Sequence, residues 1–263
     1  MTGVNGVGRP SLVILDVDGV LAPAGAPVPG EVAGLVRDIA ARCRVALASG
    51  KPAPYLEGLA RGMDLPDVPV IAENGGVVYL PDKKEEVVYT DLYPEAGEET
   101  VLLRARLAGR LAGRCWFQPN KVAVTGFPRG RLDVAGLHRE FRAAVADLGL
   151  RRLVIYVHPD AVDAVPAGLD NGWGADVLAD LLGLAKGDFA VVGDGPGGLP
   201  GACGRRAMRA ARSAGRGRPA RRTRSTRRTW RCAAFIFRTC SGAVRSTLPG
   251  CCFSTPGRPE QAF

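Results

Sequence analysis

The stretch Leu12-Val13-Ile14-Leu15-Asp16-Val17-Asp18-Gly19-Val20 decides the fold. Its four consecutive apolar residues predict a strand that is buried on both faces, as in a parallel sheet. Two carboxylates, Asp16 and Asp18, follow at the carboxyl end of this strand, which is where open parallel sheets bind ligands. An Asp carboxylate can accept a phosphoryl group covalently, and a second can hold Mg²⁺ or transfer a proton. The alternative is that these residues have no function and only form a polar strand end that leads into a glycine turn.

Strands and helices alternate outward from this stretch. The elements expected in this core are helices over residues 29–43, 53–62 and 174–182, and buried strands over 45–48, 70–72, 162–165 and 189–192. Strands joined by helices in this order form right-handed crossovers and a parallel sheet. The predicted fold class is therefore α/β, with a Rossmann-like parallel-sheet core.

The pattern changes after Glu73-Asn74-Gly75-Gly76. The elements expected next are strands over 77–80, 86–91, 116–118, 122–127 and 153–158, and helices over 95–111 and 132–148. Hairpins mixed with helices are typical of an α+β unit. We predict a discontinuous core made of residues 1–80 and 162–200, with an inserted domain over residues 81–161.

The last part of the chain differs from the rest in composition. Residues 1–200 hold 20 Lys and Arg against 25 Asp and Glu, a net charge of −5. Residues 201–263 hold 15 Arg, no Lys and one acid, a net charge of +14. Five Cys lie there without CxxC spacing, which disfavours a zinc module. The tail shows no apolar periodicity and is expected to be disordered; one hypothesis is that the reading frame was lost near residues 197–204.

Composition disfavours two other classes of protein. Met1–Pro10 lacks the apolar segment of a signal peptide, and the chain has no apolar run long enough to span a membrane. Only Cys43 and Cys115 occur before residue 200, so nothing indicates a disulfide framework. We therefore expect a cytoplasmic protein with no membrane partner, while the oligomeric state is left open.

Four motifs occur in order at the predicted strand ends: Asp16-Val17-Asp18-Gly19-Val20, Ser49-Gly50, Glu73-Asn74-Gly75-Gly76 and Gly193-Asp194. Over residues 11–200, their order and spacing resemble the haloacid dehalogenase superfamily of Mg²⁺-dependent phosphatases. The resemblance is to members with an α/β cap inserted after the second motif, a group that includes phosphoglycolate and sugar-phosphate phosphatases. It implies that residues 81–161 form such a cap.

The resemblance also implies a role for each motif residue. Asp16 would attack phosphorus, and Asp18 would be the general acid and base. Ser49 would hydrogen-bond the phosphoryl oxygens, and Gly50 would let the backbone approach them. Asp16, the Asp18 carbonyl and Asp194 would hold Mg²⁺ through oxygen ligands. The expected substrate is a small phosphorylated metabolite, phosphoglycolate first and a sugar phosphate second, hydrolysed through an aspartyl-phosphate.

Three more residues are candidates for substrate binding. Glu73 and Asn74 could face the boundary between core and cap, although residues 74–76 also suit a plain turn. Asn120 could touch a carboxylate or phosphate of the substrate, and a solvated loop is the alternative. His138 and His158 are expected to be a solvated helix residue and a strand-end residue.

The chain departs from the family pattern at two motif positions. Asn171 stands where the third motif normally has a lysine, and Gly198 stands where the fourth motif has a second acid. Asn171 remains a candidate catalytic residue. Its amide carries no charge, so the reaction is expected to be slower by a factor of roughly 10²–10³. Lys51 or Lys186 could supply a charge instead. We therefore expect an impaired phosphatase.

Three alternative interpretations of the sequence have less support. Gly193–Gly198 matches the GxGxxG of dinucleotide-binding folds, but Pro200 disfavours the helix that must follow. Gly50-Lys51 lacks the earlier glycine of a Walker loop. The remaining alternative is a catalytically inactive remnant whose basic tail binds nucleic acid non-specifically; no specific nucleic acid is expected, because the tail has few aromatic residues for base stacking.

Overall fold

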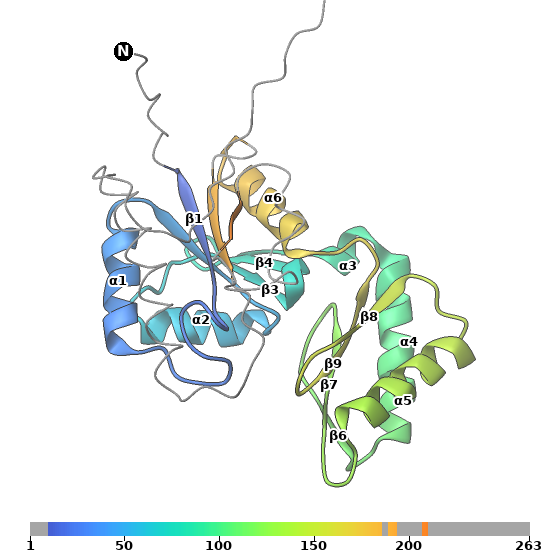
Figure 1. Ribbon diagram of the computed structural model, residues 1–263. Helices are drawn as coiled ribbons and strands as arrows, with labels where there is room; N and C mark the ends of the chain where they lie inside the picture. The colour runs from blue at the N-terminus through green and yellow to red at the C-terminus, as the bar shows by residue number, and fades with distance from the viewer. Residues whose placement is uncertain (1–9, 186–188, 194–206, 210–263) are drawn as a thin grey trace, which may run out of the picture.

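The computed structural model of the 263-residue chain describes residues 10–185, 189–193 and 207–209, and it contains two sheets (Figure 1). The larger sheet has, in spatial order, β11 (Ala207–Arg209), β10 (Phe189–Gly193), β1 (Leu12–Asp16), β2 (Arg44–Ala48), β3 (Val70–Ala72), β4 (Val77–Leu80) and β5 (Glu85–Val88). The strands from β11 to β3 are parallel, while β4 and β5 extend one edge as an antiparallel hairpin. The predicted α/β class with a parallel-sheet core is confirmed.

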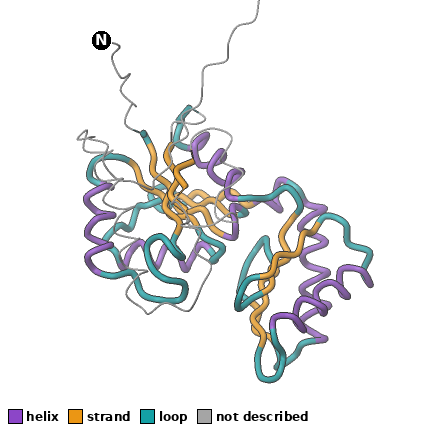
Figure 2. Tube along the Cα trace, viewed as in Figure 1, coloured by secondary structure: helices purple, strands orange, loops and turns teal. Residues whose placement is uncertain are grey.

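Helices cover both faces of this core sheet (Figure 2). On one face, α1 (Gly30–Ala40) and α2 (Ala53–Gly62) pack with Val13 and Leu15. On the other face, α6 (Asn171–Leu181) packs with Leu12 and Ile14. Because successive side chains of a strand point to opposite faces, all four must be apolar. This double coverage explains the unbroken apolar run.

The smaller sheet, which we call the cap sheet, is covered on one face. Its strands, in spatial order, are β6 (Cys115–Phe117), β7 (Val124–Pro128), β9 (Val162–Pro166) and β8 (Leu153–Val157), all antiparallel. The helices α4 (Pro94–Arg110) and α5 (Val134–Asp147) pack on one face around the buried Phe141. Trp116 and Tyr156 point the other way and are exposed. We call that second side the open face.

Two predictions about the insertion are wrong. The strand expected to return to the core over 162–165 is β9, which pairs with β7 and β8 in the cap sheet. The second strand of the expected hairpin, over 86–91, was placed in the insertion, but it is β5 (Glu85–Val88), which pairs with β4 in the core sheet; the chain then forms the short helix α3 (Tyr89–Leu92) instead of more strand. The division into core and cap remains a proposal, and the sheets favour a cap over residues 94–166.

The predicted tail lies mostly outside the described residues. The three residues of β11 form a strand where no structure was expected, beside β10. Lys186, Asp194 and Gly198 are outside the described ranges as well. Within those ranges, no helix has both the length and the apolar character needed to cross a bilayer.

Candidate active site

The predicted catalytic residues lie at one edge of the core sheet, where parallel strands end together. Asp16 is the last residue of β1 and pairs in register with Ala48, so Ser49 follows directly on the neighbouring strand. On the other side of β1, Gly193 ends β10, and a Cβ built on it would stand 3.8 Å from Oδ2 of Asp16. Asp16 therefore lies between the ends of β10 and β2, with its Oδ2 near Gly193 of β10.

Asp18 lies in a tight turn directly after β1. The Gly19 N–H donates to the Ala22 carbonyl at 2.7 Å, and Gly19 has φ +82°, a conformation that glycine adopts without strain. The Asp18 carboxylate accepts a hydrogen bond from the Gly25 N–H at 3.4 Å. The turn thus keeps both carboxylates of the first motif close to the end of β1.

Ser49 is nearly buried and begins the loop between β2 and α2. Its Oγ accepts a hydrogen bond from the Lys51 N–H at 3.3 Å. A Cβ at Gly50 would stand 3.0 Å from Oδ1 of Asn74, tighter than most such contacts. A larger residue at position 50 would therefore have to displace the Asn74 side chain of the neighbouring turn.

Glu73 is directed at the cap and is almost fully buried. Its carboxylate accepts backbone N–H bonds from Lys121, Val122 and Ala123, at 2.9, 2.7 and 3.3 Å. Burial raises the pKa of this carboxyl, and the three N–H donors and the Arg104 charge oppose that rise. Since cap backbone occupies its oxygens, we no longer assign Glu73 to substrate binding.

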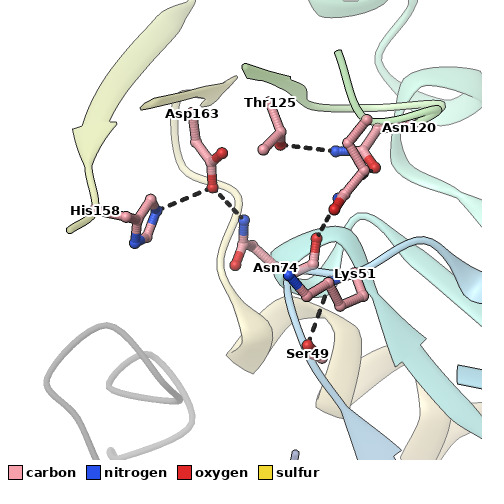
Figure 3. A network of polar contacts seen from close by, with 9 residues as sticks. Ser49, Lys51, Asn74, Asn120, Thr125, His158 and Asp163 are labelled. Atoms are coloured by element: carbon pink, nitrogen blue, oxygen red, sulfur yellow. Dashed lines mark hydrogen bonds and ion pairs between the residues drawn. The ribbon is translucent and has the colours of Figure 1, made fainter. Parts of the chain in front are cut away.

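Asn74 joins the core to the open face of the cap sheet (Figure 3). Its Nδ2 donates to Oδ2 of Asp163 at 3.5 Å, and Nε2 of His158 lies 3.0 Å from the same oxygen. The hydrogen bond with Asp163 raises the pKa of His158. Sequence reasoning placed His158 at a strand end, which is where it lies, but it did not identify Asp163 as its partner.

Asn120 is buried rather than in a solvated loop. Its Nδ2 donates to Oγ1 of Thr125 at 2.9 Å, and its Oδ1 accepts from Nε2 of Gln118 at 2.8 Å. The same Gln118 nitrogen donates to the Gly50 carbonyl at 3.1 Å. Both ends of the Asn120 amide are thus paired within the cap. Gln118, which no motif had indicated, is a cap residue that donates to the motif loop, the segment of residues 49–52 between β2 and α2.

Asn171 begins α6 and is buried. Asp170 caps the helix by accepting N–H bonds from Gly172 and Trp173. Among the described residues, the side-chain Oδ1 of Asn171 has no hydrogen-bond partner. A buried amide oxygen without a partner costs free energy, and no described residue donates a hydrogen bond to this one.

Lys51 is the one Lys or Arg in the described segments that follow β1, β2 and β3 or precede α6. Its Nζ lies 5.6 Å from the centre of the Phe127 ring on β7, within cation–π range. The ammonium group therefore sits where the motif loop meets the open face of the cap sheet. Of the two lysines considered as replacements for a third-motif lysine, the structure describes only this one.

The expected Mg²⁺ ligands are oxygen atoms, which suits this cation. Asp16 and Asp18 supply them at the end of β1, and the missing side chain at Gly193 leaves room beside Oδ2 of Asp16. The donor chemistry fits a hard cation. Across residues 10–185, 189–193 and 207–209, no three His, Cys, Asp or Glu side chains gather as a metal-binding group, and Asp194 lies outside those ranges.

Comparison with known proteins supports the resemblance. A phosphoglycolate phosphatase from Natronomonas pharaonis is 32% identical over 190 residues, which cover 68% of this chain and 75% of that protein. A trehalose-6-phosphate phosphatase related protein of known structure has a TM-score of 0.58 at 14% identity, covering 86% of this chain and 97% of its own. A haloacid dehalogenase-like hydrolase from Bacteroides thetaiotaomicron has a TM-score of 0.53 at 17% identity, covering 73% and 84%. These two structures carry the fold alone. No protein-family profile matches the chain.

Proposed function

Because the chain belongs to the phosphoglycolate phosphatase family of the haloacid dehalogenase superfamily, we propose that it hydrolyses small phosphate monoesters through an aspartyl-phosphate on Asp16. The observation that carries this proposal is the position of Asp16 at the end of β1, in register with the residue before Ser49 and beside Gly193. A nucleophile and a hydroxyl donor on adjacent strand ends can address one phosphoryl group.

The reaction has two steps in this proposal. A carboxylate oxygen of Asp16 attacks phosphorus, the bond from phosphorus to the ester oxygen breaks, and Asp18 gives its proton to the leaving oxygen. Water then attacks the phosphorus of the aspartyl-phosphate while Asp18 takes back a proton, which releases inorganic phosphate and restores Asp16. Ser49 donates to a phosphoryl oxygen in both steps.

Asp16, the Asp18 carbonyl and Asp194 would hold Mg²⁺, which would offset repulsion between the attacking carboxylate and the phosphoryl oxygens. Lys51 adds a second positive charge from the loop after β2. Asn171 contributes none, which supports the expectation of a reduced rate. The family name favours phosphoglycolate as substrate, with a sugar phosphate as the second candidate, and the positive charge of Lys51 beside the cap suits an anionic leaving group such as glycolate.

The test compares the unaltered chain with Asp16→Asn and with Asp67→Asn, an exposed carboxylate far along the sequence. Phosphate release with Mg²⁺ is measured on phosphoglycolate, several sugar phosphates and an aryl phosphate. We expect turnover by the unaltered chain and by Asp67→Asn, and a loss of at least about 10³-fold in Asp16→Asn, since covalent catalysis then has no nucleophile. Full activity of Asp16→Asn would refute the nucleophile assignment.

A further inference from the structure

The peptide unit between Gly50 and Lys51 is hydrogen-bonded at both ends. Its carbonyl oxygen accepts from Nε2 of Gln118 at 3.1 Å, and its N–H donates to Oγ of Ser49 at 3.3 Å. Gln118 belongs to the cap, just after β6, whereas Ser49 belongs to the core, just after β2. This peptide unit is therefore hydrogen-bonded on one side to a cap side chain and on the other to a core hydroxyl; Figure 3 labels Ser49 and Lys51.

This arrangement constrains how the Ser49 hydroxyl can be used. A serine hydroxyl has one hydrogen to donate and two lone pairs that accept. Since the Lys51 N–H occupies a lone pair of Oγ, the hydroxyl hydrogen must point away from that peptide. Such a preset donor is what a phosphoryl oxygen needs, because a donor that is already oriented costs no reorganisation when charge develops.

Gln118 is itself held firmly. Its backbone N–H donates to the Thr125 carbonyl at 3.0 Å, and its side-chain nitrogen also donates to Oδ1 of Asn120 at 2.8 Å. Gln118 and Asn120 are 4% and 6% exposed. Buried amides with paired atoms keep one orientation, because any rotation would leave polar groups unsatisfied.

The segment that follows Gln118 is clamped between two charged groups. Glu73 of the core accepts the N–H bonds of residues 121–123, as described above. Arg104 of α4 donates from Nη2 to the carbonyls of Asn120 and Ala123, both at 2.8 Å. The negative charge of Glu73 thus pairs with backbone N–H groups of this loop, and the positive charge of Arg104 pairs with its carbonyl groups. Without these partners, burial of the polar groups would cost free energy.

We propose that Gln118 is a positioning residue for Ser49, acting through the Gly50–Lys51 peptide, and that Glu73 and Arg104 hold the loop that carries it. This inference rests on the proposed phosphatase function and assigns the cap a part in forming the phosphoryl-binding loop. It predicts that the effect of Gln118 on catalysis passes through one hydroxyl group.

A double-mutant cycle tests that route. The variants are Gln118→Leu, Ser49→Ala and the two combined, each assayed for kcat and KM with Mg²⁺ on the best substrate of the panel. We expect Ser49→Ala to lower kcat/KM by about 10²-fold and Gln118→Leu by about tenfold. In the double variant we expect no loss beyond that of Ser49→Ala, because Gln118 then has no Ser49 hydroxyl to position. Losses that multiply would overturn the proposal.

The matched control is Thr100→Val, which removes an equally buried polar group of the cap, whose Oγ1 donates to the Ala96 carbonyl at 2.9 Å. We expect its melting temperature to fall with kcat/KM unchanged, so that a general loss of cap stability is separated from the relay. Should Gln118→Leu fail to fold, Gln118→Met serves in its place, since it keeps the length of the side chain and removes the donor without adding a charge.

Binding of inorganic phosphate supplies a readout that does not depend on turnover. Calorimetry with Mg²⁺ present should give a Kd about tenfold weaker in Gln118→Leu than in the unaltered chain, and no weaker in the double variant than in Ser49→Ala. An unchanged Kd in Gln118→Leu would contradict the relay. An unaltered chain with neither turnover nor phosphate binding would refute the proposed function itself, whereas turnover with independent Gln118 and Ser49 effects would refute the relay alone.

Discussion

The two sheets of this molecule differ in where they can present functional side chains. The core sheet is covered by helices on both faces, and Leu12, Val13 and Leu47 are completely buried. The cap sheet is covered on one face, and on the other Tyr156 is 49% exposed. A sheet buried on both faces can offer functional groups only at its strand ends, while the cap sheet can also offer side chains from its open face, part of which the core covers at β9. Asp16 and Ser49 follow the first rule, and Asp163 and Phe127 follow the second.

The largest expected effect tests the difference in coverage. Leu47→Ala removes a fully buried side chain from β2 and should lower the free energy of unfolding by about 3 kcal/mol. Tyr156→Ala, on the open face of β8, should change it by less than about 0.5 kcal/mol. Urea denaturation of both variants measures this. Similar losses would mean that the open face is covered by something else in solution.

A smaller effect is expected where the two sheets meet. Glu73→Gln replaces one carboxylate oxygen by an NH₂ group that faces backbone N–H donors, so it leaves at least one buried donor unpaired. We expect a loss of about 2 kcal/mol in the free energy of unfolding. Glu86→Gln, which breaks the exposed ion pair with Lys121, should cost less than about 0.5 kcal/mol. Equal losses in chemical denaturation would show that the carboxylate of Glu73 holds the cap no better than a surface contact.

Lys51 connects a strand end of the core to the open face of the cap. Lys51→Met keeps the length of the side chain and removes its charge. We expect KM for phosphate esters to rise about tenfold, or about 1.4 kcal/mol, with little change in kcat. Lys83→Met, in the exposed turn between β4 and β5, is the control. If KM stays constant in Lys51→Met, the charge is not used to bind substrate.

The smallest effect concerns His158 on the open face. The hydrogen bond with Asp163 raises its pKa above the ordinary 6.5, helped by Asp163 and Asp160 charges and opposed by burial and Lys51. A raised folded-state pKa means that protonation stabilises the fold. That contribution is complete below pH 6.5 and is lost as pH rises through the folded pKa. Denaturation of the unaltered chain and of His158→Gln from pH 5 to 9 measures this. The difference in their free energies of unfolding should become smaller as the pH rises. A difference that does not change with pH would mean that protonation of His158 does not stabilise the fold.

The same contrast explains what the sequence could predict. Leu12–Leu15 predicted a doubly covered strand because burial on both faces requires an unbroken apolar run. Residues 162–165 were predicted to form a strand of the core, although Asp163 interrupts their apolar residues. In the structure Val162 and Ala164 pack against the helices of the cap sheet, while Val165 packs in the cluster of the core sheet, so both faces of β9 are buried. Periodicity reports burial and cannot tell which sheet provides it.

The candidate site divides in the same way. Asp16 and Ser49 could be found because each follows an apolar strand in a recognisable motif. Gln118 and Arg104 could not, because their partners are backbone atoms distant in sequence, and such contacts leave no pattern of residue types. Glu73 was predicted to face the boundary between core and cap and to bind substrate, and its carboxylate accepts backbone N–H bonds there. The sequence alone does not distinguish a glutamate that accepts backbone N–H bonds from one that binds a ligand.

The turn η1 (Glu73–Gly75) has a mechanical consequence. It grips the cap loop through Glu73, and at Gly75 it lies so close to the return crossing of the chain that an added Cβ would collide with the Asp170 carbonyl. If the cap rotated relative to the core, it would have to break the hydrogen bonds between Glu73 and residues 121–123. Otherwise Asp170 would have to move past Gly75, where there is no room even for a methyl group. The cap is therefore expected to keep one position relative to the core. The size of substrate that the enzyme accepts would then be set by the space between the two in this structure, and not by how far the cap opens.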